Sequence, residues 1–153
     1  MANTQAFCNS AKTDLMNANF ALAATGQTRG ATTKDTLKAA LYHSTATINK
    51  STTIYTTTGE IVATNYTAGG VAVTTANAPA LDSDTAHFTP SASIVYTNIT
   101  EGTAFDCVLL YNSTTTTKYA LSVHTFGDQT ITAGDLTLTM PTNDGTTGLV
   151  RMA

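Results

Sequence analysis

Apolar and polar residues alternate over short stretches through most of the chain, and this period of two predicts β-strands. In residues 135–140, Leu136, Leu138 and Met140 alternate with Asp and Thr, as expected for a strand with one buried face. Pro141 follows directly, and proline cannot continue the hydrogen-bonded ladder of a sheet. The pattern therefore predicts a strand that ends near residue 140.

Two apolar runs near the C-terminal third predict an adjacent antiparallel pair. Residues 104–112 and 118–127 flank the sequence STTTT, which is typical of a polar turn between strands. The second run alternates apolar and polar positions from Tyr119 to His124, so we expect it to be half-buried. A further strand is predicted to begin at Leu37, within LKAALYHSTATI (residues 37–48), where Leu37, Ala39 and Leu41 share one parity.

The remaining segments read as short strands joined by turns. Glycines divide residues 51–75 into two short runs, and residues 76–85 are expected to form a loop because they are rich in Pro, Asp and Ser. One strand is expected within residues 87–99. The turn sequence Asp144-Gly145 precedes a last short strand in residues 148–153. Seven or more short strands at regular spacing favour an all-β fold, a β-sandwich or jelly-roll-like pair of antiparallel sheets.

The N-terminal part differs from the rest. Asn9 or Ser10 is a candidate cap for a short helix, in which Leu15, Met16, Asn19 and Phe20 follow at spacings near three and four. The small, polar stretch of residues 21–35 predicts a flexible surface arm. We therefore divide the chain into residues 1–36, an N-terminal helix and flexible arm, and residues 37–153, a β-sandwich domain.

Charge is scarce, and hydroxyl groups replace it. Of 153 residues, 35 are Thr and only 11% are charged, less than half of the usual share of about 25%. Residues 1–50 hold five cations and two acids, whereas residues 51–153 hold two cations and eight acids. This asymmetry could steer the N-terminal part towards an acidic partner or the body of a neighbouring subunit; scattered solvated charge is the simpler interpretation.

Several classes of protein are disfavoured by the same counts. No apolar run approaches the roughly 18 residues of a membrane span, and the first residues lack the basic and apolar regions of a secretory signal. Seven scattered Lys and Arg residues give no basic patch for nucleic acid. We expect neither a membrane nor a nucleic acid as a partner.

Candidate catalytic and ligand-binding residues are few. His43, His87 and His124 have no metal-binding spacing, and we interpret them as ordinary strand residues. Cys107 and His124 could be drawn as a nucleophile and its base, but Cys107 lies in an apolar run, where burial makes a thiol inert. We expect Cys8 and Cys107 to be buried, unpaired thiols, because free cysteine is often a core residue; a bridge would form only with their Cα atoms within about 7 Å.

Two loop motifs are equally weak. Asp82 and Asp84 form a D-x-D without the glycine and terminal glutamate of a calcium-binding loop, so a solvated turn is the preferred interpretation. Gly69-Gly70 lacks the context of a phosphate-binding loop. The sequence therefore predicts no catalytic residue, no cofactor and no metal site, and the protein is not expected to be an enzyme.

A family resemblance rests on the order and spacing of four segments. Residues 37–73 contain ALYHSTATINKSTTIYTTTGEIVATNYTAGGVAV, and they are followed by CVLLYNSTTTTKYALSVHTFG and DLTLTMPTNDGTTGLVRMA, while FCNSAKTDLM opens the chain. Together these segments resemble small virion structural proteins of tailed bacteriophages, described as head decoration or minor structural proteins. The middle of the chain, residues 75–100, matches least, and the Trp-free segment before residue 105 departs from the family pattern.

The resemblance implies a structural role. It suggests a capsid decoration (cement) protein on the capsid surface of the virion, made in the host cytoplasm, which binds and stabilises the outer shell. The implied partners are the major capsid protein and further copies of this chain, a homo-oligomer. Two alternatives remain: a tail or fibre-associated subunit, and a glycan- or receptor-binding β-sandwich module, although aromatic residues make up only 7% of the chain and Trp is missing.

Overall fold

The computed structural model describes residues 3–22 and 34–153 and shows an all-β fold with one short helix in that part of the chain. All strand pairs are antiparallel, so the predicted fold class is confirmed. The elements in chain order are β1 (Ala6–Phe7), α1 (Asn9–Met16), β2 (Leu37–His43), β3 (Val71–Ala72), β4 (Ala80–Asp82), β5 (Thr85–Phe88), β6 (Ile94–Asn112), β7 (Ala120–Leu138) and β8 (Val150–Met152).

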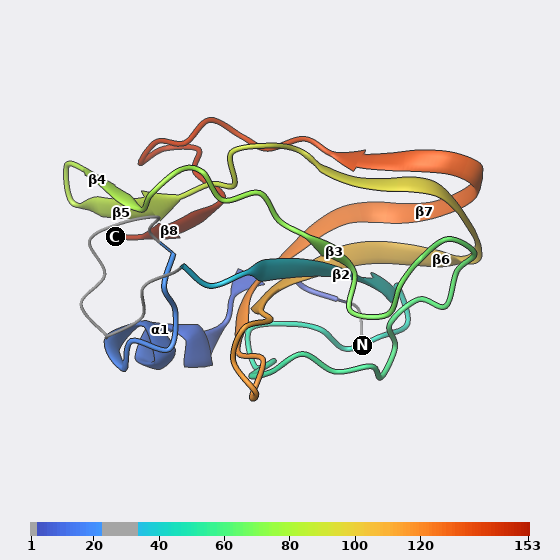
Figure 1. The fold of residues 1–153 in the computed structure, drawn as a ribbon, viewed down its shortest axis with the longest axis horizontal. Helices are drawn as coiled ribbons and strands as arrows, with labels where there is room; N and C mark the ends of the chain where they lie inside the picture. Colours follow the sequence, from blue (N-terminus) through green and yellow to red (C-terminus); the bar gives the residue numbers. More distant parts are fainter. Residues whose placement is uncertain (1–2, 23–33) are drawn as a thin grey trace.

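The strands form two sheets, and one long bent hairpin creates the two layers of the fold. The main sheet has the order β1-β7-β6-β2-β3, and the small sheet has the order β4-β5-β8. Figure 1 shows that the β6–β7 hairpin folds back on itself at the right-hand end. The pairing register shifts repeatedly between Tyr96 and Cys107, and such bulges bend a strand. Residues 94–99 and 134–138 consequently lie over the other half of the same hairpin.

The lower half of the hairpin is covered on both faces. Residues 107–112 of β6 and 120–123 of β7 are buried without alternation, because the bent-over half covers one face and α1 with the connection after β2 covers the other (Figure 1). The expectation of a half-buried strand at residues 119–124 was therefore wrong. In contrast, the predicted alternation of residues 135–140 is present in the bent-over half, where one face is open to solvent.

Two regions differ from the predicted secondary structure. Residues 76–85, expected to be a loop, contain β4 and the start of β5, joined in a hairpin at Ser83 and Asp84. Residues 51–75, expected to contain two short strands, form only isolated bridges before β3, such as Tyr42 with Glu60. The last strand and the turn at Asp144 are as predicted: the Asp144 carboxylate accepts hydrogen bonds from the backbone N–H groups of Thr146 and Thr147.

The N-terminal residues pack on the main sheet. The helix is preceded by Cys8 as its N-cap and makes no side-chain cap bond, so the expected cap at Asn9 or Ser10 was wrong. Its buried side is formed by Ala11 and Asp14, whereas Met16 is 87% exposed. The arm expected at residues 21–35 falls largely on residues 23–33, which lie outside the described residues. Its flanks are joined, since Asp35 accepts a hydrogen bond from the Ala21 N–H at 2.7 Å.

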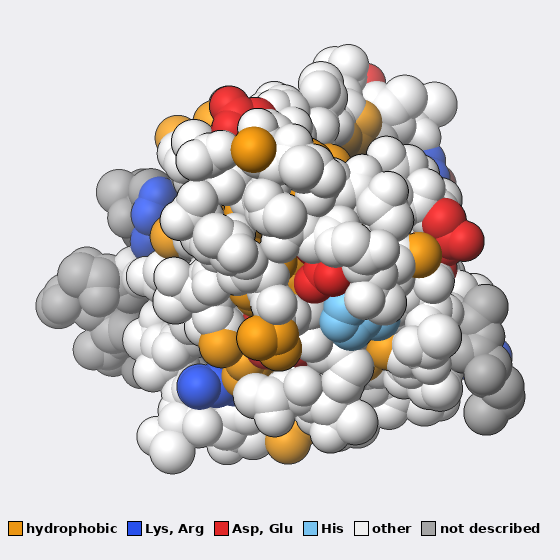
Figure 2. Space-filling view, turned by 90° about the vertical axis from the view of Figure 1, so that its right-hand side faces the viewer, with side chains coloured by type: hydrophobic (Ala, Val, Ile, Leu, Met, Phe, Trp, Pro, Cys, Tyr) orange, Lys and Arg blue, Asp and Glu red, His pale blue; other side chains and the backbone are white. Residues whose placement is uncertain are grey.

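Uncharged polar groups cover much of the surface. Figure 2 views the molecule from the bent end of the hairpin, where white side chains and backbone predominate over the few charged groups. Exposed threonines of this hairpin include Thr97, Thr130 and Thr132. Exposed hydroxyl side chains are thus part of this surface, in line with the composition.

Candidate functional site

Glu60 is the centre of a buried polar cluster. Its side chain is 6% exposed and accepts three hydrogen bonds of 2.6 Å, from the hydroxyls of Tyr55 and Tyr66 and from the backbone N–H of Gly69. Tyr111 donates its hydroxyl to the Gly69 carbonyl at 2.9 Å and stacks on Tyr55 at 4.6 Å. We call these five residues the Glu60 cluster. Charge-assisted bonds of this number offset the cost of burying a carboxylate.

The cluster connects separate parts of the fold. The Tyr66 hydroxyl also accepts the backbone N–H of Leu41 in β2 at 3.0 Å, and the Tyr66 ring stacks on Tyr96 of β6 at 6.1 Å. The Tyr96 hydroxyl in turn donates to the Ala39 carbonyl at 2.9 Å. The irregular connection between β2 and β3 is therefore held by side chains, because it has few strand pairs of its own.

The tyrosine hydroxyls in the cluster remain protonated donors near neutral pH. Burial, and then the hydrogen bond to Glu60, raise the pKa of Tyr55 and Tyr66 well above the ordinary value. Burial followed by the charge of Glu60 raises the pKa of Tyr111 to about 12. The Glu60 cluster thus has fixed donors around one acceptor, an arrangement suited to holding a fold together.

The structure explains why a glycine pair occupies the turn before β3. Gly70 has a φ of +71°, and a Cβ at this position would lie 1.6 Å from the carbonyl oxygen of Ala39. The close approach follows from the pairing of β3 with β2, where Val71 lies opposite Ala39. Gly69-Gly70 therefore serves as a turn and a backbone contact, as the turn interpretation predicted.

Sequence reasoning missed Glu60 as the centre of a buried polar cluster, although a signal was present. Glu60 is the one acidic residue between Asp35 and Asp82, in a stretch rich in Thr and Tyr. A single charge in such an uncharged segment is a candidate for a specific partner, since buried charges require one. The segments YTTTGE and YTAGG, which carried much of the family resemblance, supply Tyr55, Glu60, Tyr66 and both glycines.

The two cysteines are free and buried, as expected. Burial raises the pKa of the Cys8 thiol to about 12 and, together with the charge of Asp106, raises the pKa of Cys107 far above its ordinary value. Cys107 is paired with Thr125, and Val108 is paired with His124. Because neighbouring residues on a strand point to opposite faces, Cys107 and His124 lie on opposite faces of the sheet and cannot form a nucleophile–base pair.

The other candidate residues do not converge. His87, in β5, has its Nδ1 atom 3.2 Å from the side-chain oxygen of Asn143. His43 is the last residue of β2, in the other sheet. Asp82 and Asp84 are exposed at the β4–β5 turn, and Asp82 accepts the N–H of Gly145 at 3.3 Å. Among the described residues, no group of three or more His, Cys, Asp or Glu side chains could hold a metal ion.

An apolar pocket of about 290 Å³ opens between the two layers of the bent hairpin. His124 lies in its wall, with Nε2 2.9 Å from the Ser122 hydroxyl. Burial lowers the pKa of His124 from 6.5 to about 4. The imidazole is therefore neutral at pH 7. The side chains that line the pocket are mostly apolar: Ile94, Val108, Leu110, Phe126, Leu138, Met140 and Leu149.

This burial gives a pH dependence of stability. The pKa of His124 is lower in the folded than in the unfolded chain, so its contribution is fully present above pH 6.5 and is lost as the pH falls towards 4. We expect a loss of about 2–3 kcal/mol in the free energy of unfolding over this range. Urea unfolding at several pH values measures it.

The control for this prediction is a pair of substitutions. His124→Asn should remove most of the pH dependence between 6.5 and 4, whereas His43→Asn should leave it in place. An unchanged slope in the His124→Asn protein would show that another group is responsible.

Comparison of the chain with protein-family models, with curated proteins and with solved structures finds no significant match in any of the three. The helix α1, which has eight residues, is not long or apolar enough to cross a membrane, and the described residues contain no other candidate span.

Proposed function

We propose that this protein is a non-enzymatic structural protein of a tailed-phage virion, a capsid decoration (cement) protein that binds and stabilises the outer shell. The observation that carries the proposal is the Glu60 cluster. Residues from two motifs of the segment 37–73 that resembles phage virion proteins, YTTTGE and YTAGG, meet in it through direct hydrogen bonds. The matched residues are thus one structural unit, and their joint occurrence supports a shared fold more strongly than separate motifs would.

The surface of the molecule suits repeated weak contacts. Few charged groups on the face in Figure 2, together with exposed threonines, allow close packing against another protein without the cost of burying unpaired charge. On a symmetric shell, many such contacts act together and avidity retains the subunit without a single strong site. The proposed partners are the major capsid protein and other copies of this chain.

The copy number of the protein in purified virions tests the proposal. We expect a ratio to the major capsid protein near one, or a simple fraction such as a half or a third, by quantitative mass spectrometry. Protein added to particles that lack it should also bind and raise the temperature at which the shells open.

Other ratios would contradict the proposal in different ways. A ratio of a few per cent or less would assign the protein to the tail, a fibre or a single vertex. Absence from particles would exclude a virion role and favour the glycan- or receptor-binding module, which a glycan array with the purified protein would then examine.

A further inference from the structure

A row of apolar side chains crosses the small sheet, and part of this row is exposed to solvent. Leu81, Ala86 and Met152 lie directly opposite one another on β4, β5 and β8, so they share one face of the sheet. Further along the same face, Phe88 and Val150 are buried in the core. Leu81 is 71% exposed and Met152 is 40% exposed. The apolar face of this sheet therefore extends beyond the part that the molecule itself covers.

The row leads into a groove between β8 and α1. Met152 lines this groove, whose volume is about 640 Å³, together with Phe7, Leu15 and Met16. Met16, which lines the groove, is 87% exposed. Contiguous exposed apolar surface of this kind marks an interaction site more often than isolated apolar residues do.

Charge is arranged around this surface in a complementary way. Lys12 and Arg151 line the groove, while Asp82 and Asp84 are exposed at the β4–β5 turn next to Leu81. The turn thus presents an apolar side chain beside acids, and the groove presents apolar side chains beside cations. The β4–β5 turn and the groove between β8 and α1 are therefore complementary in both hydrophobicity and charge.

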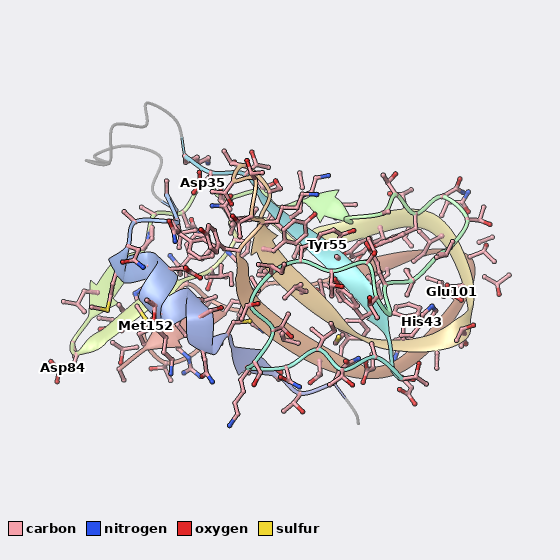
Figure 3. The ribbon with its side chains drawn as sticks, turned by 90° about the horizontal axis from the view of Figure 1, so that it is seen from below. Asp35, His43, Tyr55, Asp84, Glu101 and Met152 are labelled. Atoms are coloured by element: carbon pink, nitrogen blue, oxygen red, sulfur yellow. The ribbon has the colours of Figure 1, made fainter. Side chains whose placement is uncertain are left out.

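The turn and the groove lie at the same end of the molecule, which determines the symmetry. Ala86, which is paired with Met152, is only two residues from Asp84, and Figure 3 shows Met152 beside α1 and Asp84 at the neighbouring tip. The turn is therefore directed away from its own groove. In a two-fold pair, each turn would meet the groove of the other copy, so that both complementary contacts form at once.

We infer that two copies of this chain associate through this end surface, with Leu81 and Asp84 of each copy against Met16, Met152 and Lys12 of the other. The inference deepens the self-association that forms part of the proposed function and rests on it. It concerns the protein in solution, so it is tested separately from the copy number in virions.

The test is sedimentation equilibrium of the full-length protein from 1 to about 300 µM, a range chosen for contacts of micromolar strength. We expect a reversible dimer. Met16→Glu should weaken dimerisation by at least tenfold, because it places an acid in the groove beside the incoming turn. Val62→Glu is the matched control, since Val62 is 94% exposed and lies outside the surface, and it should leave the dimerisation constant unchanged.

A charge exchange tests the pairing itself. Lys12→Glu and Asp84→Lys should each weaken the dimer severalfold, and the double variant should recover most of the loss because the opposite charges face each other again. The positions substituted in both tests, Lys12, Met16, Val62 and Asp84, are exposed. Circular dichroism should therefore show a native spectrum for each variant.

A monomer at every concentration, or a dimer that responds equally to Met16→Glu and Val62→Glu, would overturn the inference. So would a monomer in which Met16→Glu abolishes binding to shells, since the surface would then contact the capsid. If the protein is absent from virions but its dimer is weakened by the single charge variants and restored in the double variant, only the proposed function is overturned.

Discussion

Gly70→Ala is expected to prevent stable folding. A Cβ on residue 70 would lie 1.6 Å from the carbonyl oxygen of Ala39, 2.4 Å from its carbonyl carbon and 2.8 Å from the Cα of Ala40. All three atoms belong to the backbone of β2, whose pairing with β6 fixes its position. The strand cannot move without breaking these bonds, so we expect a loss of more than about 4 kcal/mol in the free energy of unfolding. Circular dichroism and urea unfolding measure it.

Two other glycines separate the steric cost from the conformational cost. Gly127 has a φ of +78° but would have no atom within 4 Å of an added Cβ, so Gly127→Ala should cost about 1–2 kcal/mol for the left-handed conformation alone. Gly102 also has open space and no positive φ, and Gly102→Ala should be close to neutral. If Gly70→Ala unfolds at the same urea concentration as Gly127→Ala, the close approach to Ala39 is not as described.

Glu60→Gln is expected to lower the free energy of unfolding strongly, although less than Gly70→Ala. The carboxylate accepts three hydrogen bonds, and an amide of the same shape must turn its NH₂ group towards one of these donors. With the NH₂ group towards Tyr55, that hydroxyl must turn to accept and its own proton loses its partner; charge-assisted bonds are also replaced by neutral ones. We expect a loss of about 2–4 kcal/mol in the free energy of unfolding, measured with urea at pH 7.

The control is the same substitution at a carboxylate with fewer partners. Glu101 is also buried, at 8% exposure, but among the described residues its side chain accepts one hydrogen bond, from the N–H of Thr103. Glu101→Gln should cost about 1 kcal/mol. Equal losses at the two positions would show that burial, and not the number of donors around Glu60, determines the effect.

Damage to the Glu60 cluster should also spread along the chain. Tyr66 bonds the Leu41 N–H and Tyr111 bonds Gly69, so the connection between β2 and β3 depends on the cluster for its position. Hydrogen exchange in Glu60→Gln should therefore increase in this connection more than in the β6–β7 pair, where backbone ladders persist.

Part of the fold could be predicted because it depends on local pattern. Leu136, Leu138 and Met140 alternate with polar residues, and the bent-over half of the hairpin does have one open face. The turn at Asp144 is determined by a side chain that bonds the backbone two and three residues later. In contrast, the hairpin at Ser83 and Asp84 was missed, since its Pro, Asp and Ser content is the same in a loop and in a tight turn.

For the candidate sites, too, the sequence could predict local properties but not which residues meet in the fold. The sequence alone disfavoured a reactive thiol, because Cys107 lies in an apolar run. It could not show that Cys107 and His124 point to opposite faces, since that depends on the register between two strands. Nor could it assign the exposed row of Leu81 and Met152, which are about 70 residues apart in the sequence and meet only through β5.

By itself the sequence determined the composition of this protein's surface and the class of its fold: period-two patterns, abundant threonine and scarce charge lead to antiparallel strands with a hydroxyl-rich exterior. Only the tertiary structure decided that β6 and β7 bend back to form both layers, that Glu60 is the acceptor for three donors on both sides of it in the chain, and that Gly70 must have no side chain. The physical reason is that pattern and propensity act between neighbours in the chain, whereas a buried carboxylate and a backbone contact depend on groups that only folding brings together.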